Sequence, residues 1–310
     1  MPRVSIIMPA FNAEAHLAEA LASIVAQTYR DWEVVVGDDG STDSTPDIAA
    51  QFGTRVKVAR SEANRGPSAA RNLAISHSSG ELLAFLDSDD YWLPNYLEHQ
   101  VGLYDTRRAD GTNVGIVACN ARILGPDGFL PGTYDEHVDA GGDVTVTRLL
   151  RSNPIFASAI SPRRVVDQAG GFCTDLRGTE DHDLWLRIVE LGHTVILSRT
   201  PVAVYRIRGQ SLSADPGPMA VGSQAVLRRA LDRGNLTARE RRIAQRELRL
   251  QHAIERIAST DGRYRRLPST LPLLVRVAAE HPRRWPSFAR VLASRGRSLS
   301  RFGGSGSHRD

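Results

Sequence analysis

The sequence predicts an α/β protein with a Rossmann-like, mostly parallel sheet flanked by helices, followed by a helical appendage. Short apolar runs alternate with amphipathic stretches through the first 120 residues, and polar residues stand where several of the runs end. This alternation is typical of doubly wound parallel sheets. Beyond residue 215 apolar residues return every three or four positions, which indicates helices.

Five apolar runs predict the strands of the first half, and the stretches between them predict its helices. The expected strands are 4–8, 32–36, 56–59, 82–86 and 115–121. The expected helices are 13–27, 44–52, 68–77 and 97–104. In the first of these helices Leu17, Leu21 and Ile24 recur on one face.

The segments after residue 121 predict their secondary structure less strongly. The turn Gly125-Pro126-Asp127-Gly128 predicts a hairpin. An amphipathic helix is expected over 184–191, with strands over 194–197 and 203–207. Thr237-Ala238-Arg239-Glu240 matches a capping box, which predicts the start of a helix in the appendage.

Charge is divided unevenly along the chain. Residues 206–310 hold 22 arginines against 8 acidic residues, whereas residues 1–205 hold 17 basic residues against 27 acidic ones. A basic tail suits an anionic membrane surface, a polyphosphate-bearing acceptor or a nucleic acid, and a solvated helical face would look the same. We expect no nucleic-acid partner and leave peripheral membrane contact and a homo-oligomer open.

The number of cysteines and the length of the apolar runs indicate the cellular compartment of the protein. Cys119 and Cys173 are too few for a disulfide framework and lack metal-ligand spacing, so we expect two buried thiols in a reducing, cytoplasmic setting. The apolar run at the N-terminus is too short for a signal peptide, and no run reaches about 18 apolar residues. We therefore expect a cytoplasmic protein, in solution or peripheral on the inner face of the membrane.

The acidic triplet Asp87-Ser88-Asp89 directly follows the fully apolar run 82–86. Carboxylates one residue apart at a strand end can face a hard divalent cation that keeps positions open for phosphates. The triplet therefore predicts a site for Mn²⁺ or Mg²⁺. The alternative is that the aspartates only form a turn.

Two other strand ends and two helix starts carry polar residues. Ligands of open parallel sheets bind beyond the carboxyl ends of the strands. The segment 9–12 and the pair Asp38-Asp39 lie at such ends, and 64–66 leads into a helix that carries Arg71, a residue suited to phosphate or to a plain surface position. Residues 178–183 precede a helix and offer a base, or merely a cap.

Taken in order, these segments resemble the inverting glycosyltransferases of family 2. The resemblance covers about residues 3–213, through 4–12, 38–43, 64–72, 86–90, 170–172 and 180–181. It implies an A-type glycosyltransferase fold and transfer of a sugar from a nucleotide-diphosphate donor, with UDP or dTDP favoured. The acceptor would be a hydroxyl of a saccharide, a lipid-linked saccharide or another molecule.

The resemblance also implies roles for individual residues. Asp39 would accept the imide N–H of the base, and Asp181, next to Glu180, would be the general base. Asp89 would bind the metal, and Asp87 the metal or the ribose. Other residues expected at the nucleotide are Pro9, Ala10, Phe11, Asn12, Asp38, Asn64, Gly66, Arg71 and Ser88. Those expected at the diphosphate or acceptor are Trp185 and Arg208, the latter near a position where many relatives have a metal-binding histidine.

The implied organisation is a catalytic domain over 1–214, a basic helical region over 215–302 and a disordered tail over 303–310. Residues 1–120 would form the nucleotide-binding half of the domain, and 121–214 the half with the acceptor site and base.

A dehalogenase-type phosphohydrolase is disfavoured because the single lysine, Lys57, precedes Asp87. A sugar nucleotidyltransferase or dinucleotide oxidoreductase would need a glycine-rich loop after the first strand. A non-catalytic sugar-binding scaffold is the remaining alternative.

Overall fold

The computed structural model describes residues 1–138, 142–207 and 216–258. The chain divides into two compact units, Met1–Ser211 and Leu212–Asp310. Arg208, residues 259–302 of the expected basic helical region and the tail expected over 303–310 lie outside the described residues.

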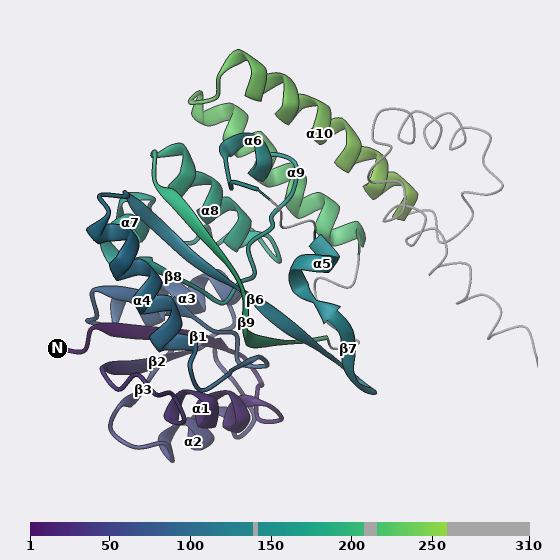
Figure 1. The fold of residues 1–310 in the computed structure, drawn as a ribbon. Helices are drawn as coiled ribbons and strands as arrows, with labels where there is room; N and C mark the ends of the chain where they lie inside the picture. The colour runs from purple at the N-terminus through teal and green to yellow at the C-terminus, as the bar shows by residue number, and fades with distance from the viewer. Residues whose placement is uncertain (139–141, 208–215, 259–310) are drawn as a thin grey trace, which may run out of the picture. The chain divides into compact units, whose positions relative to one another are not determined.

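The described strands of the first unit form one nine-stranded sheet (Figure 1). They are β1 (Val4–Ala10), β2 (Trp32–Asp38), β3 (Val56–Arg60), β4 (Leu82–Phe85), β5 (Tyr91–Trp92), β6 (Val114–Gly125), β7 (Gly128–Thr133), β8 (Ala159–Pro162) and β9 (Thr194–Arg206). Their order is β3-β2-β1-β4-β8-β6-β9-β5, with β7 beside β6.

The direction of the strands confirms the mostly parallel sheet. β1 pairs in parallel with β2 and β4, β2 with β3, and β6 with β9. Only β5, β7 and β8 among the described strands run the other way, since each pairs antiparallel with its neighbours. The hairpin expected at residues 125–128 joins β6 to β7.

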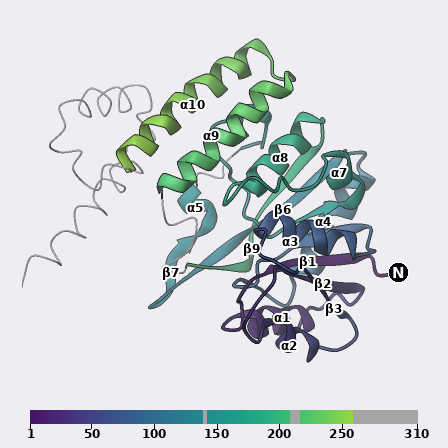
Figure 2. The ribbon, with the colours of Figure 1, turned by 180° about the vertical axis from the view of Figure 1, so that it is seen from behind.

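Helices cover both faces of the sheet. Those of the first unit are α1 (Leu17–Val25), α2 (Thr45–Ala50), α3 (Pro67–Ser76), α4 (Tyr96–Ala109), α5 (Tyr134–Val138), α6 (Val146–Leu149), α7 (Arg163–Gln168) and α8 (Glu180–Glu190). Residues of α1 and α4 share one apolar cluster with Ile6 and Val34. On the opposite face α3 packs on β1 and β2 (Figures 1 and 2). Trp185 of α8 packs against Phe85 of β4.

Two elements differ from the sequence prediction for local reasons. α1 starts at Leu17 rather than at residue 13, because Asn12 has a left-handed φ of 48° and the Ala13 N–H donates to Thr45 Oγ1 at 2.7 Å. The strands expected over 194–197 and 203–207 are one strand, β9, which continues through irregularities in its pairing with β6.

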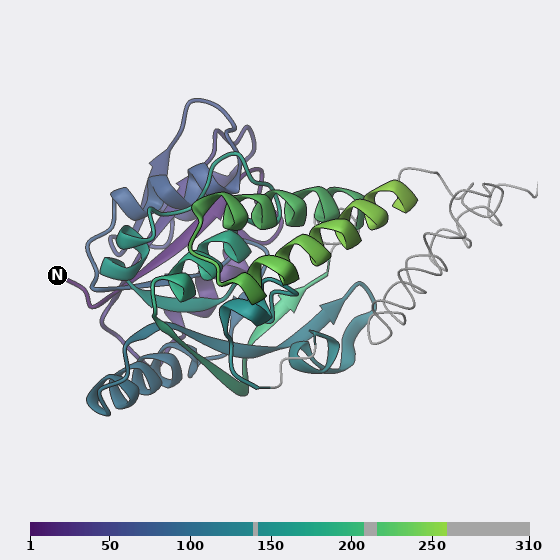
Figure 3. The ribbon, with the colours of Figure 1, turned by 90° about the horizontal axis from the view of Figure 1, so that it is seen from above.

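The described part of the second unit is a pair of helices, α9 (Pro216–Arg233) and α10 (Ala238–Ala258), which lie side by side (Figure 3). The predicted capping box is confirmed. The Thr237 N–H donates to Glu240 Oε2 at 3.0 Å, and the Glu240 N–H donates to Thr237 Oγ1 at 3.3 Å. No described helix has the length and apolarity needed to cross a bilayer.

Neither Cys119 nor Cys173 forms a disulfide in the described part of the chain. Cys119 is buried as expected, and burial raises the pKa of its thiol above the ordinary value. Cys173 is only half-buried, so the expectation of a second buried thiol is wrong.

Gly37 allows α3 to lie close to β2. A Cβ at this position would stand 2.1 Å from the carbonyl oxygen of Ala70, which is far inside contact distance. Ala70 precedes Arg71, and Gly37 precedes Asp38, so this contact places two parts of the candidate site relative to one another.

We expect Gly37→Ala to lower the free energy of unfolding by about 1–3 kcal/mol, because the new methyl group would push α3 off the sheet. Urea denaturation measures the change. Gly102→Ala in α4 is the matched control, since nothing lies within 4 Å of its Cβ position and alanine favours a helix by about 1 kcal/mol. Equal effects of the two substitutions would contradict the packing argument.

Candidate functional site

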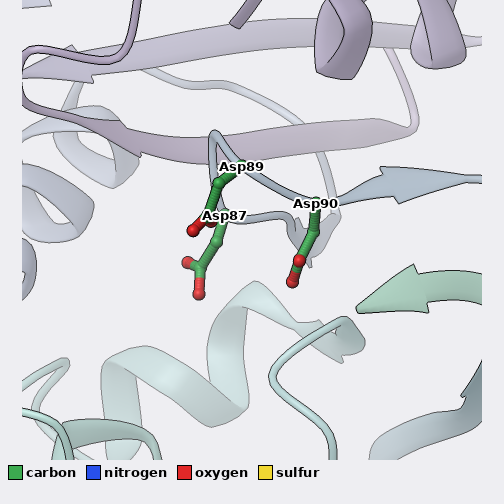
Figure 4. Close-up of side chains that lie close together, drawn as sticks. All are labelled: Asp87, Asp89 and Asp90. Atoms are coloured by element: carbon green, nitrogen blue, oxygen red, sulfur yellow. The ribbon is translucent and has the colours of Figure 1, made fainter. Parts of the chain in front are cut away.

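Three aspartates gather on the loop that follows β4. Each of Asp87, Asp89 and Asp90 offers a carboxylate oxygen, and these oxygens lie within 4.8 Å of one another. Figure 4 shows the three side chains directed to the same side of the loop. Sequence analysis proposed Asp87 and Asp89 but not Asp90 as a ligand. We call residues 87–90 the metal loop.

The metal loop has the chemistry expected of a divalent-cation site. Burial and the charges of Asp89 and Asp87 raise the pKa of Asp90 well above its usual value. Such crowding of carboxylates disfavours their ionised forms unless a cation offsets the repulsion. Oxygen donors are also those that Mg²⁺ and Mn²⁺ prefer, so the residues present fit such an ion.

Arg206, at the end of β9, holds the metal loop through two hydrogen bonds. Its backbone N–H donates to Asp90 Oδ1 at 2.8 Å, and its Nε donates to the carbonyl oxygen of Asp89 at 2.9 Å. Sequence analysis assigned Arg206 no role. The Tyr205-Arg206 pair in the predicted last strand was the available signal, but the contact depends on strand order.

Arg71 of α3 joins the metal loop to α8. Its Nη2 lies 2.6 Å from Asp87 Oδ1, and its Nη1 lies 2.8 Å from Glu180 Oε1. Burial works against the charge of Arg71, but the two carboxylates outweigh it and raise the pKa of the guanidinium. The other oxygen of Glu180, Oε2, is buried and has no hydrogen-bond partner among the described residues.

Asp181 lies in the first turn of α8, whereas sequence analysis placed it in a loop before the helix. Its carboxylate accepts the His182 N–H at 2.7 Å and Asn153 Nδ2 at 3.1 Å. Burial, and next the charge of Glu180, raise the pKa of Asp181 to about 7. Asn153, which sequence analysis missed, lies in a segment without a periodic pattern.

The pair Asp38-Asp39 organises the loop after β2. Asp39 is 2% exposed and accepts backbone N–H groups of Arg65 and Gly66, the latter at 2.7 Å. Asp38 is fully buried and accepts the Ser41 N–H at 3.0 Å. Asp38 therefore bonds within the loop, and its expected place at the nucleotide stays a prediction.

The side chains of Asn64 and Asn12 also accept hydrogen bonds from backbone N–H groups of the loops at this edge. Asn64 Oδ1 accepts the Gly66 N–H at 3.1 Å, beside the carboxylate of Asp39. Asn12 Oδ1 accepts the Thr42 N–H at 2.9 Å, which ties the end of β1 to the loop after β2. The loops after the two strands therefore form one surface.

The remaining expected site residues differ in exposure. Pro9 and Ala10 are buried in β1, while Phe11 is 45% exposed beyond its end, and Ser88 is half-buried on the metal loop. Trp185 is 1% exposed and packs against Phe85, with 5.7 Å between ring centroids. It lies on the buried face of α8, and its expected place at the diphosphate or acceptor stays a prediction.

Comparison with known proteins identifies the family. Residues 5–125 match the sequence model of glycosyl transferase family 2. The Escherichia coli protein named UDP-Glc:alpha-D-GlcNAc-diphosphoundecaprenol beta-1,3-glucosyltransferase WfgD is 44% identical over 188 residues, covering 60% of this chain and 70% of that protein. The chain belongs to glycosyl transferase family 2. A putative teichuronic acid biosynthesis glycosyltransferase of Bacillus subtilis, TuaG, is 29% identical over 218 residues, covering 69% of this chain and 82% of that protein.

Solved structures give this family 2 member an A-type glycosyltransferase fold. S. aureus TarS in complex with UDP-GlcNAc has a TM-score of 0.65 at 19% identity, covering 90% of this chain and 87% of that one. The mannosyltransferase PcManGT from Pyrobaculum calidifontis, with GDP-Man and Mn²⁺, has a TM-score of 0.65 at 23% identity, covering 95% and 86%. At these identities the likeness shows the fold alone. Family membership makes the chain a glycosyltransferase that uses a nucleotide sugar.

Proposed function

We propose that this family 2 glycosyltransferase moves a sugar from a UDP-sugar to a hydroxyl of a lipid-linked saccharide by a single displacement that inverts the anomeric centre. The observation that carries the proposal is the setting of Asp181. This carboxyl group has a pKa of about 7 and lies in the turn that Arg71 ties to the metal loop.

Asp181 has the properties of a general base. A base works best when its pKa lies near the working pH, because it is then both ionised and able to take a proton. Asn153 and His182 hold both carboxylate oxygens with N–H groups, which orients the carboxylate. In the proposed step Asp181 takes the proton of the acceptor hydroxyl as the hydroxyl oxygen attacks the anomeric carbon.

The metal loop is the proposed place of the donor diphosphate. Asp89 and Asp87 would hold Mn²⁺ or Mg²⁺, with Asp90 in the same cluster. When bound, the cation would neutralise charge that develops on the leaving nucleoside diphosphate. The bond between the anomeric carbon and the diphosphate oxygen breaks as the new glycosidic bond forms.

The loops after β1 and β2 are the proposed nucleoside site. Asp39 would accept the imide N–H of uracil, since its carboxylate has about four acceptor positions and the loop uses only some of them. The exposed ring of Phe11 would pack on the nucleoside. The UDP-Glc in the name of the 44% identical relative supports uracil over thymine.

The same relative supports the acceptor class and the stereochemistry. Its name specifies a diphosphoundecaprenol-linked GlcNAc acceptor and a β-1,3 linkage. Glucose in UDP-Glc is α-linked, so a β product requires one inversion. A single displacement with one positioned base accomplishes that inversion.

We predict that Asp181→Asn lowers the transfer rate by about 10²–10⁴-fold while the Kd for UDP changes little, because the amide cannot take a proton. In the wild type, kcat/KM should fall as the pH drops below about 7, the pKa of Asp181. Radiolabelled transfer from UDP-Glc to a GlcNAc-diphospholipid measures both, and proton NMR of the product reports the anomeric configuration.

Stability provides the control for this variant. A raised pKa favours the neutral carboxyl in the folded state, so the stability that Asp181 contributes is complete below its unfolded pKa and is lost as pH rises through about 7. Asp181→Asn should therefore be at least as stable as the wild type at pH 8. Rapid transfer by this variant, or a product with the configuration of the donor, would refute the proposal.

We predict that Asp89→Ala weakens Mn²⁺ binding and abolishes Mn²⁺-dependent binding of UDP, as measured by calorimetry. Loss of one carboxylate from a small oxygen-ligand set removes a direct ligand. Asp110→Ala is the control, because Asp110 is an exposed aspartate at the end of α4. Unchanged Mn²⁺ affinity in Asp89→Ala would contradict the assigned ligand.

A stripe of arginines on α10 supports contact with an anionic membrane. Arg239, Arg242, Arg246 and Arg249 are all exposed, and their spacing of three and four residues puts them on one helix face. We call these four residues the arginine stripe. A guanidinium binds phosphate groups well, and the proposed acceptor is carried by a lipid.

We predict that changing the arginine stripe to glutamine weakens binding to phosphatidylglycerol vesicles by about fivefold for each arginine that contacts the surface. Vesicle co-sedimentation at low salt measures the affinity. The control changes Arg107 and Arg108, which are exposed in the last turn of α4. Equal losses in both variants, or binding to neutral vesicles as strong as to anionic ones, would rule out the stripe as a specific contact.

A further inference from the structure

Arg71 connects two segments that are far apart in the sequence. Its contact with Asp87 spans 16 positions and its contact with Glu180 spans 109. The side chains of Arg71 and Glu180 are each 7% exposed. Three charged groups therefore form one largely buried chain, from the metal loop through α3 to the first turn of α8.

This bonding leaves Arg71 poorly placed to bind the nucleotide, the role that family resemblance implies. Each of its terminal amino groups already donates to a carboxylate, and its Cζ lies 5.4 Å from the centre of the Phe172 ring. The side chain of Arg71 is 7% exposed, so little of the guanidinium is open to a phosphate.

We infer that Arg71 and Glu180 are positioning residues that fix the base Asp181 relative to the metal loop. The inference rests on the proposed function, since it takes Asp181 as the base. Glu180 and Asp181 are consecutive residues in one helical turn, so a shift of Glu180 moves Asp181 with it. A misplacement of about 1 Å at a reacting group can cost about 10²-fold in rate.

The planar fork of arginine suits this role. Its two amino groups lie at a fixed distance and can hold two carboxylates at once, whereas the ammonium group of lysine is a single point charge. Arg71→Lys therefore keeps the charge and loses the fixed spacing. Glu180→Gln keeps the shape and an acceptor oxygen and loses the charge.

The test measures kcat for transfer and the Kd for UDP with Mn²⁺ in both variants. We expect kcat to fall by about tenfold or more because the base is displaced, with the Kd for UDP within about twofold of wild type because the nucleotide does not contact either residue. Calorimetry gives the Kd, and saturating donor and acceptor give kcat.

Arg187→Lys is the matched control. Arg187 pairs with Asp183 within α8 at 2.7 Å, and their side chains are 12% and 0% exposed. The same substitution there disturbs a buried ion pair of the same helix that, among the described residues, does not involve the metal loop. It should reduce the melting temperature and leave kcat unchanged.

Several outcomes would overturn the inference. A weaker Kd for UDP with unchanged kcat in Arg71→Lys would make Arg71 a nucleotide ligand, and an unchanged kcat in Glu180→Gln would remove the positioning role. If Arg71→Lys does not fold, the nearly isosteric Glu180→Gln still decides. Rapid transfer by Asp181→Asn would refute the proposed function itself. Full rate in Glu180→Gln beside an inactive Asp181→Asn would refute only the positioning.

Discussion

Parallel pairing of β1 with β2 and β4 decides where the chemistry of this protein lies. The three strands run in one direction, so their carboxyl ends meet at one edge of the sheet, and the chain leaves each strand there with polar residues. The loop of Asp39 and the metal loop meet at this edge for that reason alone. Close packing of α3 on β2 at Gly37 then brings Arg71 to the same place.

Several carboxylates lie close together at this edge of the sheet, and the structure reduces the repulsion between them in two ways. Asp87 and Glu180 are neutralised internally by Arg71. Asp90 and Asp181 instead have raised pKa values, because burial and neighbouring carboxylates disfavour their charged forms. The proposed metal ligands Asp87 and Asp89 and the proposed base Asp181 are therefore different carboxylates, and Arg71 links the two groups through its contacts with Asp87 and Glu180.

The sequence predicted the elements whose pattern is local. The buried strands β1, β2 and β4 are mostly apolar, so their positions and the acidic residues beyond them followed from the sequence. Asp90, Arg206 and Asn153 were missed because their roles depend on which segments the folded sheet brings together. The burial of Trp185 was not predicted for a related reason: the sequence alone does not show that this face of α8 is turned toward the core.

For Arg71, the sequence motif and the contacts in the folded structure indicate different roles. Its type and its place near a helix start suit a phosphate, which is a correct argument about an isolated arginine. Inside the fold its two amino groups are used by carboxylates from distant segments. A buried cation that bonds to one buried and one half-buried carboxylate can fix the distance between them, because releasing Glu180 would leave a charge unpaired in a poorly solvated interior. The base and the metal loop are thereby held by the same side chain, which ties the two halves of the proposed reaction to a single element of the fold.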